Sequence, residues 1–141
     1  MEKSNAKVKR IADANLNRLR EGLRVAEDIS RFILDDKEIS GKIKNIRSEV
    51  SLIQKRYNDF ILFRDTKNDV GKTINSNIEK VRNSIEDIVY ANLKRIEESL
   101  RVLEELFKMI NIDDSLQFKK LRYESYILEQ DIILKLKKMA V

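Results

Sequence analysis

Apolar residues recur at alternating spacings of three and four in four long stretches of the chain, the pattern of amphipathic helices. These stretches cover about residues 4–34, 37–63, 84–110 and 115–139. Asp36 precedes the second stretch, and Ser84, with Asp87 three residues later, precedes the third, as helix N-caps do. Asp114 or Ser115 is the predicted cap of the fourth helix. The pattern therefore predicts an all-α fold.

The first and third helices carry the same sequence twice. Residues 14–32 read ANLNRLREGLRVAEDISRF and residues 91–109 read ANLKRIEESLRVLEELFKM, so an Asn, two Arg and two Glu recur at an offset of 77. A shorter match relates residues 43–49 to residues 118–124. We therefore expect one helical domain over residues 1–141, in which residues 4–63 and 78–139 form two pseudo-symmetric hairpins packed as a four-helix bundle.

Some repeated polar residues lie beside the apolar stripe, at the edge of the predicted core. They are Asn15 and Arg18 in the first copy and Asn92 and Arg95 in the second. A polar group at a core boundary needs a partner, and two arginines from symmetric helices can bind phosphate bidentately. Gly22, one turn further on, is expected to leave room for a ligand. We therefore treat these residues as candidates for phosphate or substrate binding.

Other repeated charges have a structural interpretation beside the functional one. Glu21, Arg24 and Glu27 follow one another at spacings of three, which suits intrahelical salt bridges, and this is the preferred interpretation. Arg122, near Tyr123, is a further candidate for binding phosphate, with a heterocycle stacked on the tyrosine. Packing at a bundle edge is the more common role of such an Arg–Tyr cluster.

Residues 64–77, RDTKNDVGKTINSN, interrupt the symmetry with a long segment that has no periodicity, and such segments are often functional. Its Gly71-Lys72-Thr73 resembles the end of a P-loop, but Thr66 stands where that motif needs its first glycine. The alternative is a loop in which carboxylates hold Mg²⁺ while cations and glycine amides bind phosphates. A solvated linker remains the plain alternative. The candidates for catalysis are Arg64, Asp65 and Asp69, with the two aspartates as metal ligands, and those for phosphate binding are Thr66, Gly71 and Lys72.

Composition narrows the chemistry. The chain has 0 Cys and 0 His, which excludes thiolate or histidine catalysis and zinc sites of the usual kind. Its net charge of +5 comes from interleaved acidic and basic residues, which argues for paired charges along helices and against a nucleic-acid binder. No stretch approaches the ~18 apolar residues of a membrane span, and no signal peptide is evident, so we expect a cytoplasmic protein without a membrane partner.

Four segments in this order resemble a known family: IADANLNRLREGLRVAEDISRF, FRDTKNDVG, YANLKRIEESLRVLEELFK and LRYESYILE. They are similar to the noncanonical hydroxymethylpyrimidine-phosphate kinase, a helical domain found N-terminal to thiamine-phosphate synthase in many bacteria. The resemblance covers about residues 9–130 and implies ATP-dependent phosphorylation of a pyrimidine monophosphate, with ATP and Mg²⁺ as cofactors. It does not reach the synthase barrel, so synthase activity is not implied.

The alternative function is a non-catalytic docking or regulatory module that binds a thiamine-phosphate synthase. Phosphoryl transfer between phosphates needs no His or Cys, because the work is positioning and charge neutralisation, and this agrees with the composition. The sequence also leaves open a homodimer, since Val25, Ile29 and Phe32 give the first helix a second partly apolar face.

Overall fold

The computed structural model describes residues 2–74 and 81–139, and the side chains from residue 5 onward within these ranges. In this part of the chain there are four long helices, one short 3-10 helix and no β-strand. The elements are α1 (Glu2–Phe32), α2 (Lys37–Arg56), η1 (Phe60–Phe63), α4 (Ile85–Ile110) and α5 (Ile112–Met139). The predicted all-α fold is confirmed. Residues 75–77 of the predicted loop and 78–80 of the second repeat lie outside the described residues.

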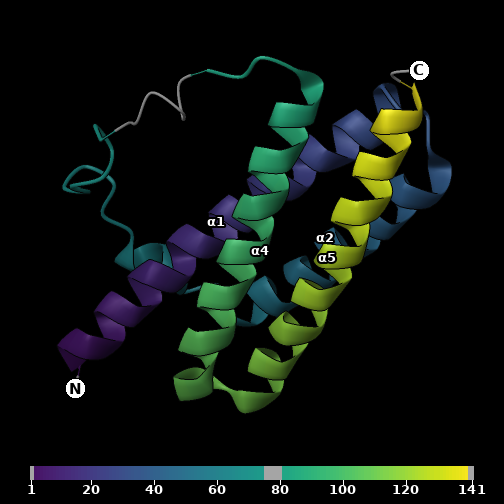
Figure 1. The fold of residues 1–141 in the computed structure, drawn as a ribbon. Helices are drawn as coiled ribbons and strands as arrows, with labels where there is room; N and C mark the ends of the chain where they lie inside the picture. Colours follow the sequence, from purple (N-terminus) through teal and green to yellow (C-terminus); the bar gives the residue numbers. More distant parts are fainter. Residues whose placement is uncertain (1, 75–80, 140–141) are drawn as a thin grey trace.

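The helices pair as two hairpins, α1 with α2 and α4 with α5, and the hairpins meet mainly through α1 and α4. In Figure 1, α4 and α5 run side by side in opposite directions, and α1 crosses behind α4. Contacts between α2 and α5 are sparser. The two helices that carry the repeated sequence therefore form the centre of the bundle, and their partners flank it.

The core consists of the apolar stripes that the sequence predicts on the repeated helices. Each of the following is at most 1% exposed: Ala12, Leu16, Leu19, Leu23 and Ala26 of α1, and Leu93, Ile96, Leu100 and Leu103 of α4. Full burial of one leucine side chain contributes about 2 kcal/mol. Packing of α1 against α4 is therefore a main source of stability, and it fixes how the polar edges of the two stripes face each other.

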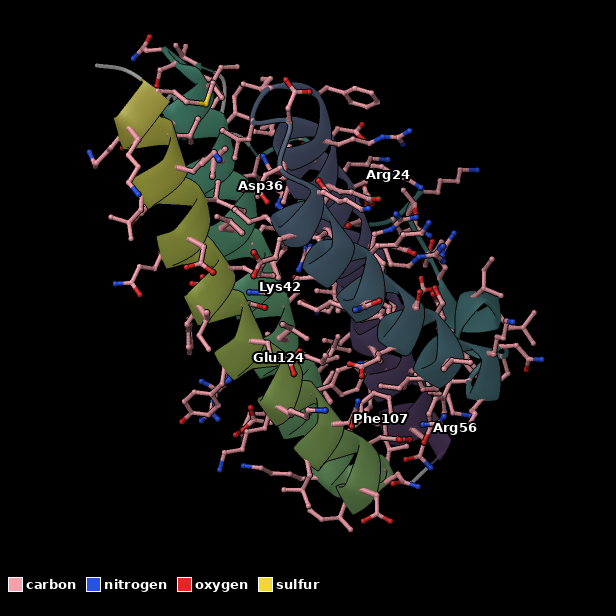
Figure 2. The ribbon with its side chains drawn as sticks, turned by 90° about the vertical axis from the view of Figure 1, so that its right-hand side faces the viewer. Arg24, Asp36, Lys42, Arg56, Phe107 and Glu124 are labelled. Carbon is pink, nitrogen blue, oxygen red and sulfur yellow. The ribbon has the colours of Figure 1, made fainter. Side chains whose placement is uncertain are left out.

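The second helix ends earlier than the expected boundary near residue 63. α2 stops at Arg56, and residues 60–63 form the separate helix η1. Tyr57 leaves the helical conformation so that its ring packs at 5.0 Å edge-on to Phe107 and at 5.1 Å on Phe60. Figure 2 shows Phe107 inside this end of the bundle, with Arg56 nearby. Aromatic packing therefore overrides the helical pattern here.

The first two caps are as predicted, and the third is not. Asp36 accepts a hydrogen bond from the Ile39 amide at 2.8 Å, and Ser84 accepts one from Asp87 at 3.1 Å. α5 begins at Ile112 and not near residue 115, because Asn111 accepts from the amide of Asp114. The Asp114 side chain instead pairs with Arg56 and Tyr57.

The connection between α1 and α2 is longer than expected, since α1 ends at Phe32 and not at residue 34. Asp35 has a φ of 49°, a left-handed conformation that Asp tolerates better than most residues. Leu34 lies within this connection and is buried, at 5% exposure. The predicted acidic break between the helices is confirmed. None of the helices in the described residues is both long and apolar enough to cross a membrane.

Candidate functional site: two grooves at the crossing of α1 and α4

The repeated Arg–Glu–Arg positions form one structural element in each hairpin, which we call the glutamate clamp. In the first hairpin, buried Glu27 is held by Arg24, at 3.9 Å, and by Arg47 of α2. In the second, Glu104 is held by Arg101 at 2.8 Å and by Arg122 of α5 at 2.9 Å. The two clamps consist of Glu27 with Arg24 and Arg47, and Glu104 with Arg101 and Arg122. The predicted intrahelical salt bridge of Arg24 with Glu27 is confirmed, whereas Glu21 forms none with the described residues. The bridges to Arg47 and Arg122 join neighbouring helices, so the clamps tie each hairpin together.

Arg122, a predicted phosphate ligand, is thus already engaged. Its guanidinium also donates to the hydroxyl of Tyr126 at 2.9 Å and lies 5.0 Å from the Tyr123 ring centre. The carboxylate of Glu104 and the Tyr126 hydroxyl raise the pKa of Arg122 above its ordinary range. The Arg122 side chain is only 13% exposed. In this structure it is part of the clamp and lines neither of the two grooves described below.

Gly22 does not leave room for a ligand, contrary to the expectation from sequence. A Cβ at this position would lie 2.9 Å from Cγ1 of Ile96 and 3.2 Å from the backbone oxygen of Asn92. Atoms of α4 therefore occupy the space beside Gly22, and Gly22 marks a close approach of α1 and α4. Its counterpart Ser99 is 2% exposed and does line a groove.

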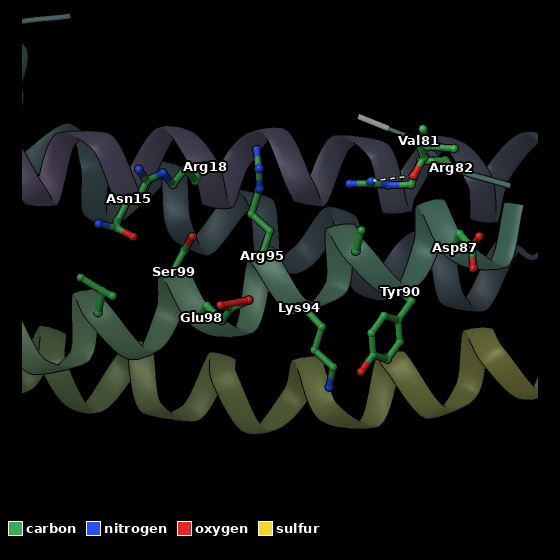
Figure 3. A pocket seen from close by; sticks show the side chains of 12 residues that line it. Asn15, Arg18, Val81, Arg82, Asp87, Tyr90, Lys94, Arg95, Glu98 and Ser99 are labelled. Carbon is green, nitrogen blue, oxygen red and sulfur yellow. Dashed lines mark hydrogen bonds between the residues drawn. The ribbon is translucent and has the colours of Figure 1, made fainter. Parts of the chain in front are cut away.

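The larger groove, of about 680 Å³, lies between α1 and α4, and we call it the tyrosine groove. It brings together the predicted residues Asn15, Arg18 and Arg95 (Figure 3). Tyr90 lies toward the other end, next to Lys94. Its lining residues are Asn15, Arg18, Val81, Arg82, Asp87, Tyr90, Ala91, Lys94, Arg95, Glu98, Ser99 and Val102.

Arg18 and Arg95 are the chemically available cations of this groove. Both are exposed, and neither makes a hydrogen bond or ion pair with another described residue. By contrast, the amide of Asn15 donates to the Ile11 carbonyl at 3.0 Å, and that of Asn92 donates to the Ile88 carbonyl at 2.8 Å. Asn15 therefore lines the groove with its side-chain NH2 group already hydrogen-bonded, whereas Asn92 does not line the groove.

The second groove, of about 250 Å³, lies between α1 and the start of the loop, and we call it the loop groove. It brings together the predicted residues Arg64, Asp65, Thr66 and Asp69, and it shares Arg18 with the tyrosine groove. Its lining residues are Arg10, Asp13, Ala14, Asn17, Arg18, Arg64, Asp65, Thr66 and Asp69. Most of the residues predicted from the repeat and from the loop therefore converge on two adjoining hollows.

Arg64 is held by Asp13, a residue that sequence reasoning missed. Two parallel hydrogen bonds of 2.7 and 2.9 Å join the guanidinium to this 4%-exposed carboxylate, which raises the pKa of Arg64. Arg10 also donates to the backbone oxygen of Asp65 at 3.0 Å. α1 therefore anchors the loop at two points. The one signal in the sequence for this partner was that Asp13 directly follows Ala12, an apolar position of the predicted core stripe.

Two of the predicted loop ligands form turns of the loop. Asp65 accepts from the amide and side chain of Asn68, and Asp69 accepts from the Gly71 amide at 2.8 Å. The Gly71 amide is therefore engaged by the Asp69 carboxylate and not by a phosphate, and Lys72 donates to the Lys67 carbonyl. Gly71 and Lys72 line neither groove. The described residues contain no group of three or more acidic side chains placed to hold a metal ion.

A charge network that the sequence did not reveal extends from Lys94, in the lining of the tyrosine groove, to two largely buried carboxylates. Lys94 donates to Glu97 at 3.2 Å and to Glu129 of α5 at 3.1 Å, and its ammonium lies 5.2 Å from the Tyr90 ring centre. Burial raises the pKa of Glu97 to about 7, and the charge of the nearby Glu129 adds to this rise, while the Lys94 ammonium opposes it. Lys94 is therefore positioned by carboxylates from α4 and α5, and its own pKa is raised mainly by Glu129.

Comparison with known proteins adds a family to this geometry. The model of the ThiD2 family matches residues 10–131, which is most of the chain. The chain belongs to the ThiD2 family. The match includes both repeated helices and the loop between them, so both grooves lie within this family's domain.

Several curated relatives are similar to the chain along most of its length. Proteins called thiamine-phosphate synthase from Synechocystis sp. and Rhodopirellula baltica are 40% identical over 126 residues and 34% identical over 131 residues. These matches cover 89% and 92% of this chain but 36% and 35% of the relatives. The chain thus spans about a third of the length of the relatives it matches. No solved structure matches the chain.

Proposed function

We propose that this chain is a kinase of thiamine biosynthesis that phosphorylates 4-amino-5-hydroxymethyl-2-methylpyrimidine phosphate to its diphosphate with ATP. Membership of the ThiD2 family and similarity to proteins called thiamine-phosphate synthase support the pathway. The reaction joins an oxygen of the monophosphate to the γ-phosphorus of ATP, the bond from that phosphorus to ADP breaks, and ADP leaves. A chain with 0 His and 0 Cys can catalyse this step by positioning and charge neutralisation.

The observation that carries the proposal is the pair of unpartnered arginines at the helix crossing. Arg18 and Arg95 come from equivalent positions of the repeat and line one groove, whereas the other repeated arginines, Arg24 and Arg101, are held by glutamates. Guanidinium groups without a carboxylate partner are suited to bind phosphate oxygens. The arginines of the clamps hold the fold, and those at the crossing are free to hold substrate phosphates.

The loop groove fits a magnesium ion that is bound together with phosphates. Mg²⁺ usually takes one or two carboxylates and completes its shell with substrate phosphates and water. Asp65 and Asp69 offer two carboxylates on one hollow, and one oxygen of Asp69 makes no hydrogen bond in the described structure. These two residues would hold the ion, which would neutralise phosphate charge. Arg64, paired with Asp13, would act mainly by holding the loop over the groove.

The direct test is incubation of the purified protein with Mg-ATP and the pyrimidine monophosphate, with the products followed by phosphorus NMR. We expect ADP and the pyrimidine diphosphate in equal amounts. Absence of the diphosphate from a folded sample would overturn the proposed reaction. Asp69→Asn should abolish turnover with little loss of stability, because Asp69 is exposed, and Asp28→Asn serves as a matched exposed acidic control that lines neither groove. Unchanged turnover in Asp69→Asn would remove Asp69 from the site.

A second function, a docking module for a thiamine-phosphate synthase, has one observation in its favour. The face of α5 opposite the core carries exposed Leu116, Tyr123, Ile127 and Leu134, at 52–58% exposure. This stripe also suits a second copy of the chain. Calorimetric titration separates the functions, because a docking module without kinase activity binds a synthase and does not bind ATP. Tight ATP binding by the chain alone would refute that second function.

A further inference from the structure

The two grooves are related by the internal repeat. Every residue that α1 contributes to the loop groove has its counterpart, 77 positions later, in the lining of the tyrosine groove. The loop-groove residues are Arg10, Asp13, Ala14, Asn17 and Arg18, and their counterparts are Asp87, Tyr90, Ala91, Lys94 and Arg95. The grooves therefore occupy equivalent surfaces of α1 and α4, as two copies of one ancestral hollow would.

The two copies differ in ways that bear on what they can bind. Where the tyrosine groove has Tyr90, which is 55% exposed and has Lys94 near its ring, the loop groove has Asp13, which is buried and paired with Arg64. The tyrosine groove is about 680 Å³, and the loop groove, covered by the residues around Asp65, is about 250 Å³. One copy is thus large and aromatic, and the other is small and lined by polar groups.

The copies also share a junction. Arg18 lines both grooves, and its counterpart Arg95 lies in the tyrosine groove on the facing helix (Figure 3). Because both guanidiniums lack a partner among the described residues, positive charge is concentrated where the hollows adjoin. A transfer between two phosphates requires two anionic groups to come together, and paired arginines offset their mutual repulsion.

From this geometry we propose that the tyrosine groove binds the nucleotide and the loop groove binds the pyrimidine monophosphate, with their phosphates meeting at Arg18. This assignment rests on the proposed function. The nucleotide is much the larger ligand, and an exposed aromatic ring is a surface on which a base can stack. The smaller ligand suits the smaller hollow, where Asn17 makes no hydrogen bond with described residues and is available to its polar edge.

Binding experiments without turnover test the assignment. Calorimetry would measure a non-hydrolysable ATP analogue with Mg²⁺, and separately the pyrimidine monophosphate, on the wild type and on three variants. Tyr90→Ala should weaken analogue binding about ten-fold and leave pyrimidine binding unchanged. Asn17→Ala should weaken pyrimidine binding about five-fold and leave analogue binding unchanged. Tyr123→Ala is the matched control, because Tyr123 is 54% exposed, lies beside Arg122 and lines neither groove.

The outcomes separate this assignment from the kinase proposal. Three results would each overturn the assignment. Tyr90→Ala could weaken pyrimidine binding alone, both ligands could respond equally to both variants, or Tyr123→Ala could act like Tyr90→Ala. A wild type that binds neither ligand would also overturn it. A wild type that binds both ligands with the expected selectivity but forms no diphosphate would overturn the kinase reaction and leave the two-groove assignment supported.

Discussion

Gly22 and Gly41 allow one substitution to be tested with opposite expected results. Both glycines lie inside helices, so replacement by alanine removes the same backbone freedom from the unfolded chain in each case. At Gly22 the new Cβ would lie 2.9 Å from Ile96 Cγ1 and 3.2 Å from the Asn92 backbone oxygen. At Gly41 the new Cβ would have no atom within 4 Å, apart from its neighbours in the chain and the backbone of its own helix. The two sites therefore differ mainly in how closely a second helix packs.

The expected free energies follow from these distances. Gly to Ala inside a helix gains up to about 1 kcal/mol from propensity. Overpacking at a tight contact costs about 1–3 kcal/mol, and one neighbour of Gly22 is backbone, which cannot rotate away. We expect Gly22→Ala to destabilise by about 1 kcal/mol and Gly41→Ala to stabilise by about 0.5–1 kcal/mol, since a position near the start of α2 gains less than the centre of a helix.

Equilibrium unfolding in urea, followed by far-UV circular dichroism, measures both changes. The midpoint should fall for Gly22→Ala and rise for Gly41→Ala, with the dependence of free energy on urea concentration unchanged. A Gly22→Ala variant at least as stable as the wild type would refute the close approach of α1 and α4. If Gly22 instead left room for a ligand, its variant would lose nucleotide binding without losing stability.

Three further predictions concern the charges of the site and the fold. Arg18→Met and Arg95→Met should each lower kcat/KM roughly 10- to 100-fold with unchanged urea midpoints. Near-normal turnover of either variant would show that its arginine does not bind the substrate phosphates. Glu104→Gln should cost about 3 kcal/mol by breaking a buried clamp, whereas exposed Glu105→Gln should leave the midpoint nearly unchanged. Burial raises the pKa of Glu97 from 4.5 to about 7. As the pH rises, the unfolded chain therefore loses this proton before the folded chain does, and the free energy of unfolding should fall by about 3 kcal/mol between these two pH values. Glu97→Gln should flatten that fall, and an unaltered pH profile would show that Glu97 is not its source.

Local rules account for what the sequence predicted well. The four helices, the Asp36 and Ser84 caps and the salt bridge of Arg24 with Glu27 depend on residues three or four positions apart, and such spacings are visible in a single sequence. That Arg18 and Arg95 lie in one groove could also be predicted, because an internal repeat places equivalent residues on equivalent helices. Duplication therefore carried information about three-dimensional proximity that periodicity alone does not.

The failures arise where distant residues decide the outcome. Asp114 looked like a cap, but Arg56 and Tyr57, more than fifty positions away, hold its side chain. Arg64 looked available to phosphate, but Asp13 binds it with two hydrogen bonds. In each case the chemistry of the residue was correctly identified, and its partner depended on how the hairpins pack. A rule based on sequence spacing has no access to that packing.

The two halves of the chain show why the repeat and the loop contribute differently to function. A symmetric pair of helices would give two identical hollows, and identical hollows cannot favour one ligand as donor and another as acceptor. The loop removes that equivalence: it covers the hollow on α1, and Arg64 reaches across it to Asp13, the position where the hollow on α4 has Tyr90. The shared arginines can remain equivalent, since both proposed ligands present phosphates. The proposed kinase site therefore needs common chemistry at its centre and different chemistry at its two ends, and a duplicated helix with one unrepeated loop can provide both.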